Sequence, residues 1–412
     1  MKPRIAIAAG LVPCLVLAAC VRVQVHGDPK AALAMNRPAA TLRVATYNTS
    51  LHDDAPGGLI ARLQRGEDGA RKIAAVLQRV RPDLVLLNEF DHDPDGRAAD
   101  LFQRDYLAVP QPDGGEGLRY PYRYLAPVNT GVPSGLDLDG DGSVGTDGRA
   151  RGNDAWGYGL HPGQYGMLVL SRHPIDTAGA RTFQHFRWSA LPGARRPRDP
   201  GTGRSFHPDA VWRALRLSSK SHWDVPVRTP LGTVHLLASH PTPPVFDGPE
   251  DRNGARNADE IRFWREYVSD PAAPWLCDDA GRCGGLPGDA AFVVAGDLNN
   301  DPLDGGGLHA AMRELLDHPR LARSPAPRSD GARWATGAGH PGRVGNPATA
   351  TADFGAATGP LRVDYVLPSR DWTVVDSGVF WPPPGAPGAA LVEASDHRLV
   401  WVDLRKGDDR AD

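Results

Sequence analysis

The sequence is poor in cysteine and nearly balanced in charge. It has four cysteines in 412 residues and a formal net charge of −3. Such a charge excludes a general polyanion-attracting surface, although local arginine clusters can offset it. The apolar run from Ile5 to Ala19 is too short for a transmembrane span. No internal repeat is visible, and a hydrophobic content of 41% supports a sizeable core, so we expect one folded domain.

The first forty residues are typical of an export signal followed by a tether. Two basic residues precede the apolar run, which ends in Leu17-Ala18-Ala19-Cys20. This ending is similar to a bacterial lipoprotein cleavage box. We therefore predict a signal peptide over 1–19, lipidation of Cys20, and a tether over 20–40. The alternative is an ordinary signal peptide with a chance cysteine. Either reading predicts export, to the cell envelope through a lipid anchor or as a secreted protein.

The other cysteines separate into two groups. Cys14 would leave with the signal peptide, whereas Cys277 and Cys283 lie close together on a polar loop rich in Asp and Gly. In an oxidising compartment such a pair is expected to form a small disulfide. A metal site is the weaker alternative, because no further cysteine lies nearby in the sequence.

The most informative motif follows the apolar run 291–295, which reads as a buried strand. It leads into Gly296-Asp297-Leu298-Asn299-Asn300. Residues two apart on an extended chain share a face, so Asp297 and Asn299 are expected to point into one cleft. A carboxylate can deprotonate a water there while a carboxamide holds a charged oxygen. By itself the motif could also be a strand-end turn, because Gly, Asp and Asn are turn formers.

Five further strand-like runs carry polar residues at or near their ends. They are 42–46 before Asn48, 83–87 before Asn88-Glu89, 234–238 before Ser239-His240, 362–367 with Asp364 inside it, and 399–402 after Ser395-Asp396-His397. Each residue alone could be an ordinary strand-end or structural group. An unpaired carboxylate inside a strand would be costly, however, and the six runs together require a common explanation.

In chain order, the motifs TYN, NEFD, SH-P, GDLNND, RVDYVL and SDH resemble the endonuclease/exonuclease/phosphatase superfamily, the DNase I-like metal-dependent phosphoesterases. The resemblance covers residues 41–405 and leaves a polar tail over 406–412. It implies an α/β fold, a four-layer sandwich in which two mixed, mostly antiparallel sheets pack face to face with helices outside. Helical periodicity over 70–80 and 257–268 predicts two of those helices.

The resemblance implies a divalent metal held by Asn48, Glu89 and Asp396. Glu89 would be the principal ligand, and Asp396 would face the same ion. Hard oxygen ligands of this kind suit Mg²⁺ or Mn²⁺ rather than zinc, which prefers nitrogen and sulfur.

It also implies catalytic roles for His240, Asp297, Asn299, Asp364 and His397. Asp297 would orient or deprotonate the attacking water, and Asn299 would hold a phosphoryl oxygen. His397 would bind the scissile phosphate or accept a proton, with Asp364 fixing its tautomer. His240 would be a second donor or acid on the leaving-group side.

The implied activity is metal-assisted hydrolysis of phosphodiesters, with a nuclease as the leading reading. A phosphomonoesterase, a sphingomyelinase-like lipid phosphodiesterase and an inactive binding protein on the same scaffold are the alternatives. Ser50 stands where the DNA-repair branch has an acid, which weakens a repair function, and Asn88 replaces a common Gln. The expected partners are a phosphoester substrate (nucleic acid, nucleotide or phospholipid headgroup) and a membrane through the anchor, with no obligate protein partner.

An acidic insertion has the spacing of a calcium loop. Asp137, Asp139, Asp141 and Ser143 fall at the ligand positions, and Gly142 falls at the sharp turn. The twelfth position is Gly148, so the bidentate Glu is missing. We favour a structural Ca²⁺ here over a solvated loop.

A basic insertion over 181–216 contains several arginines interspersed with aromatic residues, among them Trp188, Phe206 and Trp212. Such a segment could bind a phosphate or a sugar-phosphate. A solvated loop anchored by its aromatic residues is an equal alternative.

Overall fold

The computed structural model describes residues 40–337 and 342–407. The predicted signal peptide, the lipidation site Cys20 and nearly all of the tether lie outside these ranges. The last strand includes Lys406, one residue beyond the predicted end of the domain. No helix in the described ranges is long and apolar enough to cross a membrane.

The first sheet has six strands and is mixed. Its one parallel pair is β1 with β2, and all its other neighbouring strands are antiparallel. In spatial order the strands are β12 (Trp372–Val379), β13 (Val400–Lys406), β1 (Leu42–Leu51), β2 (Leu84–Phe90), β4 (Met167–Ser171) and β3 (Tyr122–Tyr124).

The second sheet has five strands and the same mixture of directions. Here β7 and β8 are parallel and the other neighbours are antiparallel. The spatial order is β11 (Asp364–Pro368), β8 (Phe292–Asp297), β7 (Gly232–Ser239), β6 (His222–Thr229) and β5 (Arg181–Thr182). A separate two-stranded ribbon is formed by β9 (Ala352–Asp353) and β10 (Pro360–Leu361).

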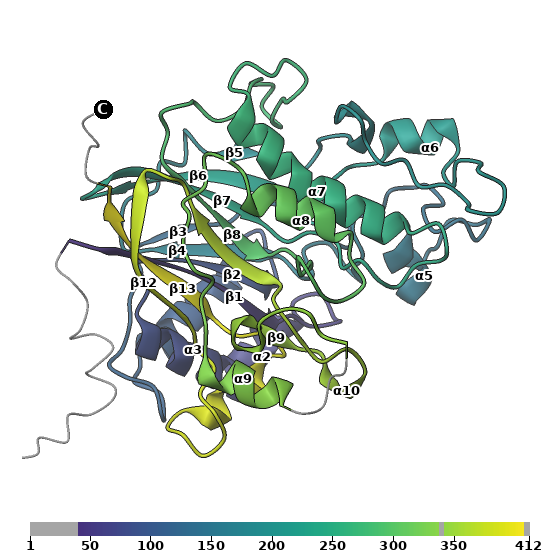
Figure 1. Ribbon diagram of the computed structural model, residues 1–412. Coiled ribbons are helices and arrows are strands. Elements are labelled where there is room, and N and C mark those ends of the chain that lie inside the picture. The colour runs from purple at the N-terminus through teal and green to yellow at the C-terminus, as the bar shows by residue number, and fades with distance from the viewer. Residues whose placement is uncertain (1–39, 338–341, 408–412) are drawn as a thin grey trace, which may run out of the picture.

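The two sheets pack face to face through a shared apolar core (Figure 1). Val44 and Val402 of the first sheet belong to the same buried cluster as Val225, Leu236 and Val293 of the second. Residues on alternate positions of the same strands point the other way, toward the helices. The predicted sandwich of two mixed, mostly antiparallel sheets with helices outside is therefore confirmed.

Helices cover the outer face of each sheet. The first sheet packs against α2 (Gly58–Arg65), α3 (Asp68–Val80) and α4 (Arg97–Leu101), and the second against α7 (Arg252–Ser269) and α8 (His309–Leu316). The connections carry α5 (Gly148–Asn153), α6 (Asp209–Ala214), α9 (Asp330–Thr336) and α10 (Gly355–Thr358). Both predicted helices are present as α3 and α7. The second begins five residues earlier than predicted, where Gly254 and Ala255 are also buried.

His222 is a buried histidine at the start of β6. Its ring lies 4.7 Å from the Phe263 ring and 4.9 Å from the Trp264 ring, measured between centroids. Nε2 is 2.9 Å from the Glu260 carbonyl and Nδ1 is 3.0 Å from the Ser218 hydroxyl, which satisfies the neutral imidazole. Burial lowers the pKa of His222 from its ordinary 6.5 to about 4.

This burial predicts a loss of stability in mild acid. Because the pKa of His222 is lower in the folded state, the unfolded chain binds the proton first on acidification. The contribution of His222 is fully present above pH 6.5 and is lost as the pH falls toward 4, at a cost of about 3 kcal/mol. Urea unfolding at pH 7.0, 5.5 and 4.5 should show this slope in the wild type and a flatter one in His222→Gln. Equal slopes in the two proteins would refute it.

Candidate active site

Four of the predicted site residues lie at the carboxyl ends of the two parallel strand pairs. Asn48 and Glu89 are near the ends of β1 and β2, His240 directly follows β7, and Asp297 is the last residue of β8. Parallel strands end at the same edge of a sheet, so each pair delivers its polar residues together. Asp364, the first residue of β11, pairs with Asp297 across the antiparallel ladder.

Asn88 joins the two sheets at this edge. Its side-chain oxygen accepts a hydrogen bond from the Asp297 backbone N–H (3.2 Å) and another from the Thr46 hydroxyl (3.3 Å). Its amide nitrogen donates to the Ser239 carbonyl (3.4 Å). In the sequence, Asn88 was noted only because its side chain is shorter than that of the Gln common at this position. In the structure its fully buried amide fixes the position of Asp297 relative to β2.

Gly296 allows β8 to approach β7 immediately before Asp297. It has φ +150°, and a Cβ atom at this position would lie 2.0 Å from the Ser239 carbonyl oxygen. A backbone carbonyl in a ladder cannot move aside as the end of a flexible side chain can. The glycine of the GDLNND motif is therefore a packing requirement of the site.

The carboxylate of Asp297 lies between the side chains of the other site residues. Its Oδ2 accepts a hydrogen bond from Asn48 Nδ2 (3.1 Å) and lies 3.4 Å from His240 Nε2 and 3.5 Å from His397 Nε2. Burial raises the pKa of Asp297 to about 6, while the charge of His397 opposes this shift and that of Asp364 adds to it. A carboxyl with a pKa near neutrality suits a general base.

His397 is held by Asp364. Its Nδ1 lies 3.0 Å from Asp364 Oδ2 and 3.2 Å from Asp364 Oδ1. Asp364 also accepts a hydrogen bond from the Thr351 hydroxyl (2.7 Å), which fixes the carboxylate. Burial lowers the pKa of His397, but the Asp364 and Asp297 carboxylates outweigh it and raise the pKa to about 10. His397 is therefore an imidazolium, which suits phosphate binding better than proton acceptance.

His240 has the opposite electrostatic state. Burial, the Lys220 charge and the His397 charge all lower its pKa well below 6.5, so the imidazole is neutral. Its Nδ1 is buried and has no partner among the described residues. A neutral imidazole can donate one N–H, so the structure favours a hydrogen-bond donor over a resident acid at this position.

Asn299 does not share an extended face with Asp297, so that part of the prediction is wrong. β8 ends at Asp297, and Asn299 has φ +52°, in the left-handed region. Its backbone N–H donates to Asp297 Oδ1 (2.9 Å), and its side-chain amide donates to the Pro241 carbonyl (3.1 Å). The turn preference of Asn prevailed over strand periodicity. One amide hydrogen of Asn299 remains for a phosphoryl oxygen.

The predicted metal ligands are linked through Asn48. Its Nδ2 donates to Glu89 Oε1 (3.1 Å), and its backbone carbonyl accepts a hydrogen bond from the hydroxyl of Ser395 (2.8 Å), the neighbour of Asp396. The Asp396 side chain is 53% exposed, in contrast to the buried Asp297 and His397. Of the three predicted ligands, Asp396 is therefore the exposed one, Glu89 is partly exposed and Asn48 is buried.

This donor set fits a hard divalent cation. Neither Glu89 nor Asp396 forms an ion pair with a Lys or Arg of the described ranges; the imidazoles near them are those of His52 (3.5 Å from Glu89) and His397 (3.9 Å from Asp396). Carboxylates without a cationic partner, together with an amide oxygen, are the ligands that Mg²⁺ and Mn²⁺ prefer.

A second trio also has metal-ligand geometry. Asp297, Asp364 and His397 each offer one ligand atom, and these atoms lie within 4.8 Å of one another. Asp364 occupies the Nδ1 side of the His397 ring, which leaves Nε2 as the nitrogen that faces the site. The resemblance implies proton handling and phosphate binding for these three residues, and this stays a prediction.

The acidic insertion forms a compact loop. Asp137, Asp139 and Asp141 bring carboxylate oxygens within 4.8 Å of one another. Within the loop, Asp137 accepts hydrogen bonds from the Gly140 and Gly142 N–H groups (2.7 and 2.9 Å), and Asp141 accepts from Ser143 N–H (2.8 Å). These bonds shape the turn without an ion, and calcium binding stays a prediction.

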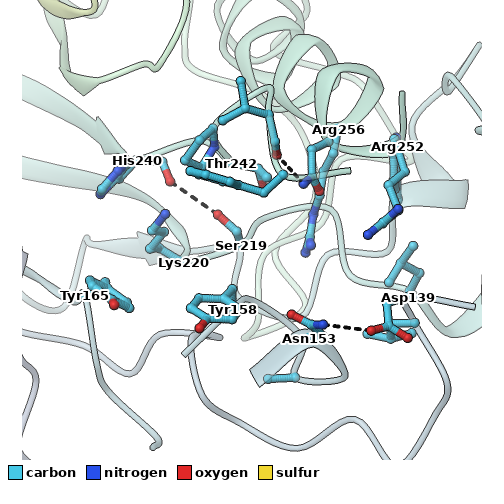
Figure 2. Close-up of a pocket in the computed structure, with 18 of the residues that line it drawn as sticks. Asp139, Asn153, Tyr158, Tyr165, Ser219, Lys220, His240, Thr242, Arg252 and Arg256 are labelled. Carbon is cyan, nitrogen blue, oxygen red and sulfur yellow. Dashed lines mark hydrogen bonds between the residues drawn. The ribbon is translucent and has the colours of Figure 1, made fainter. Parts of the chain in front are cut away.

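A cavity of about 440 Å³ opens beside the catalytic residues (Figure 2). Glu89 and His240 line one end of it, together with Tyr165 and Lys220. The cavity extends from there toward α5 and the start of α7.

Lys220 is a candidate site residue that the sequence analysis missed. Only 6% of it is exposed, and its ammonium has no hydrogen bond or ion pair with the described residues. Burial lowers the pKa of Lys220, while the Glu260, Glu89 and Asp297 charges oppose the shift. A buried cation facing the cavity next to His240 suits a phosphate oxygen. Burial is the signal that would have identified it, and no sequence pattern carries that signal.

The arginines of the basic insertion mainly hold the fold. Arg195 pairs with the buried Asp259 (2.8 Å), which also accepts a hydrogen bond from the Trp188 indole (2.7 Å). Arg196 pairs with Asp209 (2.6 Å). These contacts favour the anchoring role over phosphate binding for this part of the insertion.

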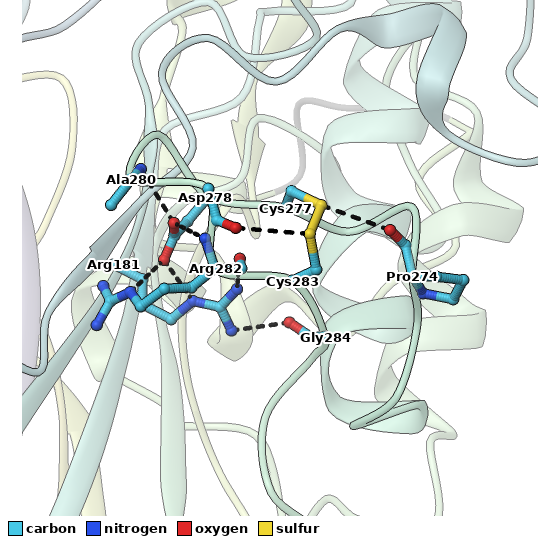
Figure 3. The surroundings of a disulfide bond; sticks show 9 residues. Arg181, Pro274, Cys277, Asp278, Ala280, Arg282, Cys283 and Gly284 are labelled. Carbon is cyan, nitrogen blue, oxygen red and sulfur yellow. Dashed lines mark hydrogen bonds and ion pairs between the residues drawn. A yellow bond between two sulfur atoms is a disulfide. The ribbon is translucent and has the colours of Figure 1, made fainter.

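Cys277 and Cys283 form the disulfide that their spacing predicts (Figure 3). The residue between them that fixes the loop is Asp278, whose buried carboxylate pairs with Arg181 Nε (2.9 Å) and Arg282 Nε (2.8 Å). Arg181 belongs to β5, so the covalent loop is tied to the edge of the second sheet.

Residues 45–397 match the model of the Endonuclease/Exonuclease/phosphatase family, and the chain belongs to this family. Members of the family share phosphoester hydrolysis as their chemistry. No curated protein matches the chain significantly.

Three solved structures are similar in outline. An endonuclease/exonuclease/phosphatase from Beutenbergia cavernae is 20% identical, with a TM-score of 0.48 over 89% of this chain and 72% of that one. Sphingomyelinase C from Streptomyces griseocarneus is 19% identical, with a TM-score of 0.45 over 88% and 99% of the two chains. A mutant beta toxin from Staphylococcus aureus with bound magnesium ions is 14% identical, with a TM-score of 0.42 over 89% and 99%. Because all three TM-scores are below 0.5, the assignment of the chain to its family rests on the match to the family model and not on these three structures.

Proposed function

We propose that the protein is a divalent-metal-dependent phosphodiesterase that uses Asp297 as its base. The strongest support for this proposal is that three side chains lie close to one buried carboxylate oxygen. Asp297 Oδ2 lies within 3.5 Å of the Asn48 amide, neutral His240 and charged His397. A base between two donors of different charge can take a proton from water while the donors hold phosphoryl oxygens.

The reaction needs few protein groups. A water oxygen attacks phosphorus as its proton passes to Asp297, and the bond from phosphorus to the leaving oxygen breaks. The His397 imidazolium and the Asn299 amide stabilise the charge on the equatorial oxygens, and His240 donates a hydrogen bond to the leaving oxygen, which takes its proton from solvent. Asp364 keeps His397 oriented and charged.

Asn48, Glu89 and Asp396 would hold the metal in this proposal. When bound, a divalent cation supplies Lewis-acid stabilisation of the charge that develops on the phosphate and the leaving oxygen. Mg²⁺ and Mn²⁺ are the favoured ions, given a donor set made of oxygen alone.

A nuclease-type diesterase is the leading form of this proposal, and a lipid phosphodiesterase is the second candidate. Val245 and Phe246 line the cavity with 43% and 78% of their surface exposed, and Phe246 has φ +65°. An exposed apolar pair beside the cavity would suit an acyl chain or a membrane surface.

We also propose that the protein is exported, anchored through Cys20 or secreted. This rests on the sequence of the first forty residues, and the Cys277–Cys283 disulfide is compatible with an oxidising compartment.

The metal requirement gives the first test. Hydrolysis of bis(4-nitrophenyl) phosphate and of 4-nitrophenyl phosphate should be measured with Mg²⁺, Mn²⁺ or Ca²⁺ and with EDTA. We expect diester turnover that EDTA abolishes and added Mg²⁺ or Mn²⁺ restores. Glu89→Gln should lower kcat/KM on the order of 100-fold or more and raise the metal concentration for half-maximal rate. Turnover of the monoester alone would identify a phosphatase, and EDTA-resistant turnover would contradict the proposal.

A further inference from the structure

The cavity continues away from the catalytic residues into a basic end. We give this name to Arg149, Arg252 and Arg256, which all line the cavity. Figure 2 shows His240, Lys220 and Tyr165 on one side of the view and Arg252 with Asp139 on the other. Asp139 is the lining carboxylate at the basic end, and it accepts a hydrogen bond from Asn153 (2.8 Å).

The arginines are only partly neutralised. Arg256 donates to three backbone carbonyls (2.6 to 3.0 Å), which hold its guanidinium in place without cancelling its charge. Arg252 pairs with Glu250. Arg149 is exposed and has no side-chain partner among the described residues. The negative charge of Glu260 is the largest influence that opposes the lowering of the Arg256 and Lys220 pKa values by burial. Both of its carboxylate oxygens, however, already accept backbone hydrogen bonds.

Two further observations indicate that the cavity is built for an anion. The Thr242 hydroxyl is buried in its wall, has no partner within the described part of the chain, and can donate a hydrogen bond to an anion. His207, also in the wall, has its pKa lowered to about 4 by burial and by the charges of Arg256 and Arg252, as expected at a site of positive potential. Polar atoms that lack a protein partner are expected to find one in a ligand.

We propose that the substrate is a small phosphodiester carrying a second anionic group, a phosphate or a carboxylate, that binds at the basic end. This rests on the proposed function, because it places the scissile phosphate at Asp297 and Lys220. A cavity of about 440 Å³ accommodates one small molecule or one end group. A cationic headgroup such as choline would face arginines there and would be disfavoured.

Two matched substrates test the proposal. Thymidine 5′-(4-nitrophenyl phosphate) has a single anionic phosphodiester, and its 3′-phosphorylated derivative adds one phosphate to the same scaffold. With Mg²⁺ or Mn²⁺ present, the wild type should have a KM about tenfold lower for the derivative, as expected for a charge-assisted contact. Arg149→Gln and Arg252→Gln should each reduce that ratio toward one while kcat on the simpler substrate stays within twofold. Arg323→Gln, at an exposed arginine that pairs with Asp317 outside the cavity, is the matched control and should keep the ratio.

Binding measurements separate this inference from the proposed function. Titration calorimetry should show thymidine 3′,5′-bisphosphate binding about tenfold more tightly than thymidine 5′-monophosphate, with the preference lost in Arg149→Gln and Arg252→Gln. If binding shows this pattern but neither ester is hydrolysed, the basic end stands and the catalytic proposal fails. Equal affinities in the wild type, or a preference that survives both substitutions, would overturn the inference.

Discussion

Asp297→Asn is expected to lower kcat for a metal-supported diester substrate about 10³-fold with little change in KM. General-base catalysis contributes roughly 10² to 10⁴ in rate. The higher part of that range applies because Asp297 Oδ2 is the one oxygen that the Asn48, His240 and His397 side chains share. An amide of the same size keeps the volume but cannot take a proton from water. Steady-state kinetics at saturating Mg²⁺ or Mn²⁺ measure the effect.

Asp301→Asn is the matched control for this substitution. Asp301 belongs to the same GDLNND segment and is also buried, but its oxygens accept hydrogen bonds from the backbone N–H groups of Leu303, Asp304 and Arg362. Its replacement should lower the melting temperature while kcat stays within a few-fold. Comparable losses of kcat in the two variants would mean that Asp297 acts only by supporting the loop.

Lys220→Met is expected to separate activity from stability. Burial lowers the pKa of Lys220, which means that the folded state disfavours the charged ammonium. An apolar side chain of similar length should therefore leave the melting temperature unchanged or raise it. The same substitution removes the buried cation beside His240, and kcat/KM should fall about 100-fold, as for other groups that stabilise charge in the reaction.

Differential scanning calorimetry and steady-state kinetics on Lys220→Met provide the two readouts, and Lys220→Arg tests the charge. Partial rescue of kcat/KM by Arg would support a contact with phosphate. A variant that loses stability and keeps kcat/KM would show that Lys220 has a purely structural role.

Local patterns predicted the strands and the polar residues at their ends, and the resemblance to the family implied the sandwich that brings them together. Apolar runs of strand length fixed β1, β2, β7 and β8, and the polar residues that follow them came together because parallel strands end at one edge. Asn299 was misplaced because the turn preference of Asn competes with strand periodicity, and only the backbone geometry decides between them.

Lys220 and the basic end were not predicted for a different reason. Arg149, Lys220 and Arg256 are far apart in the sequence, so their convergence on one cavity depends on tertiary packing. The basic insertion drew attention by its composition, yet Arg195 and Arg196 are paired with Asp259 and Asp209. Counting charges along a chain cannot separate arginines that are neutralised from those that remain available.

The pairing of β1 with β13 determines when the candidate site can assemble as the chain is synthesised. β13 lies between β12 and β1, so that Leu42 faces Leu404 across the ladder. Until β13 has been synthesised, β1 has an open edge, and His397, immediately upstream of β13, is not yet in place. A partly synthesised chain therefore cannot assemble the site.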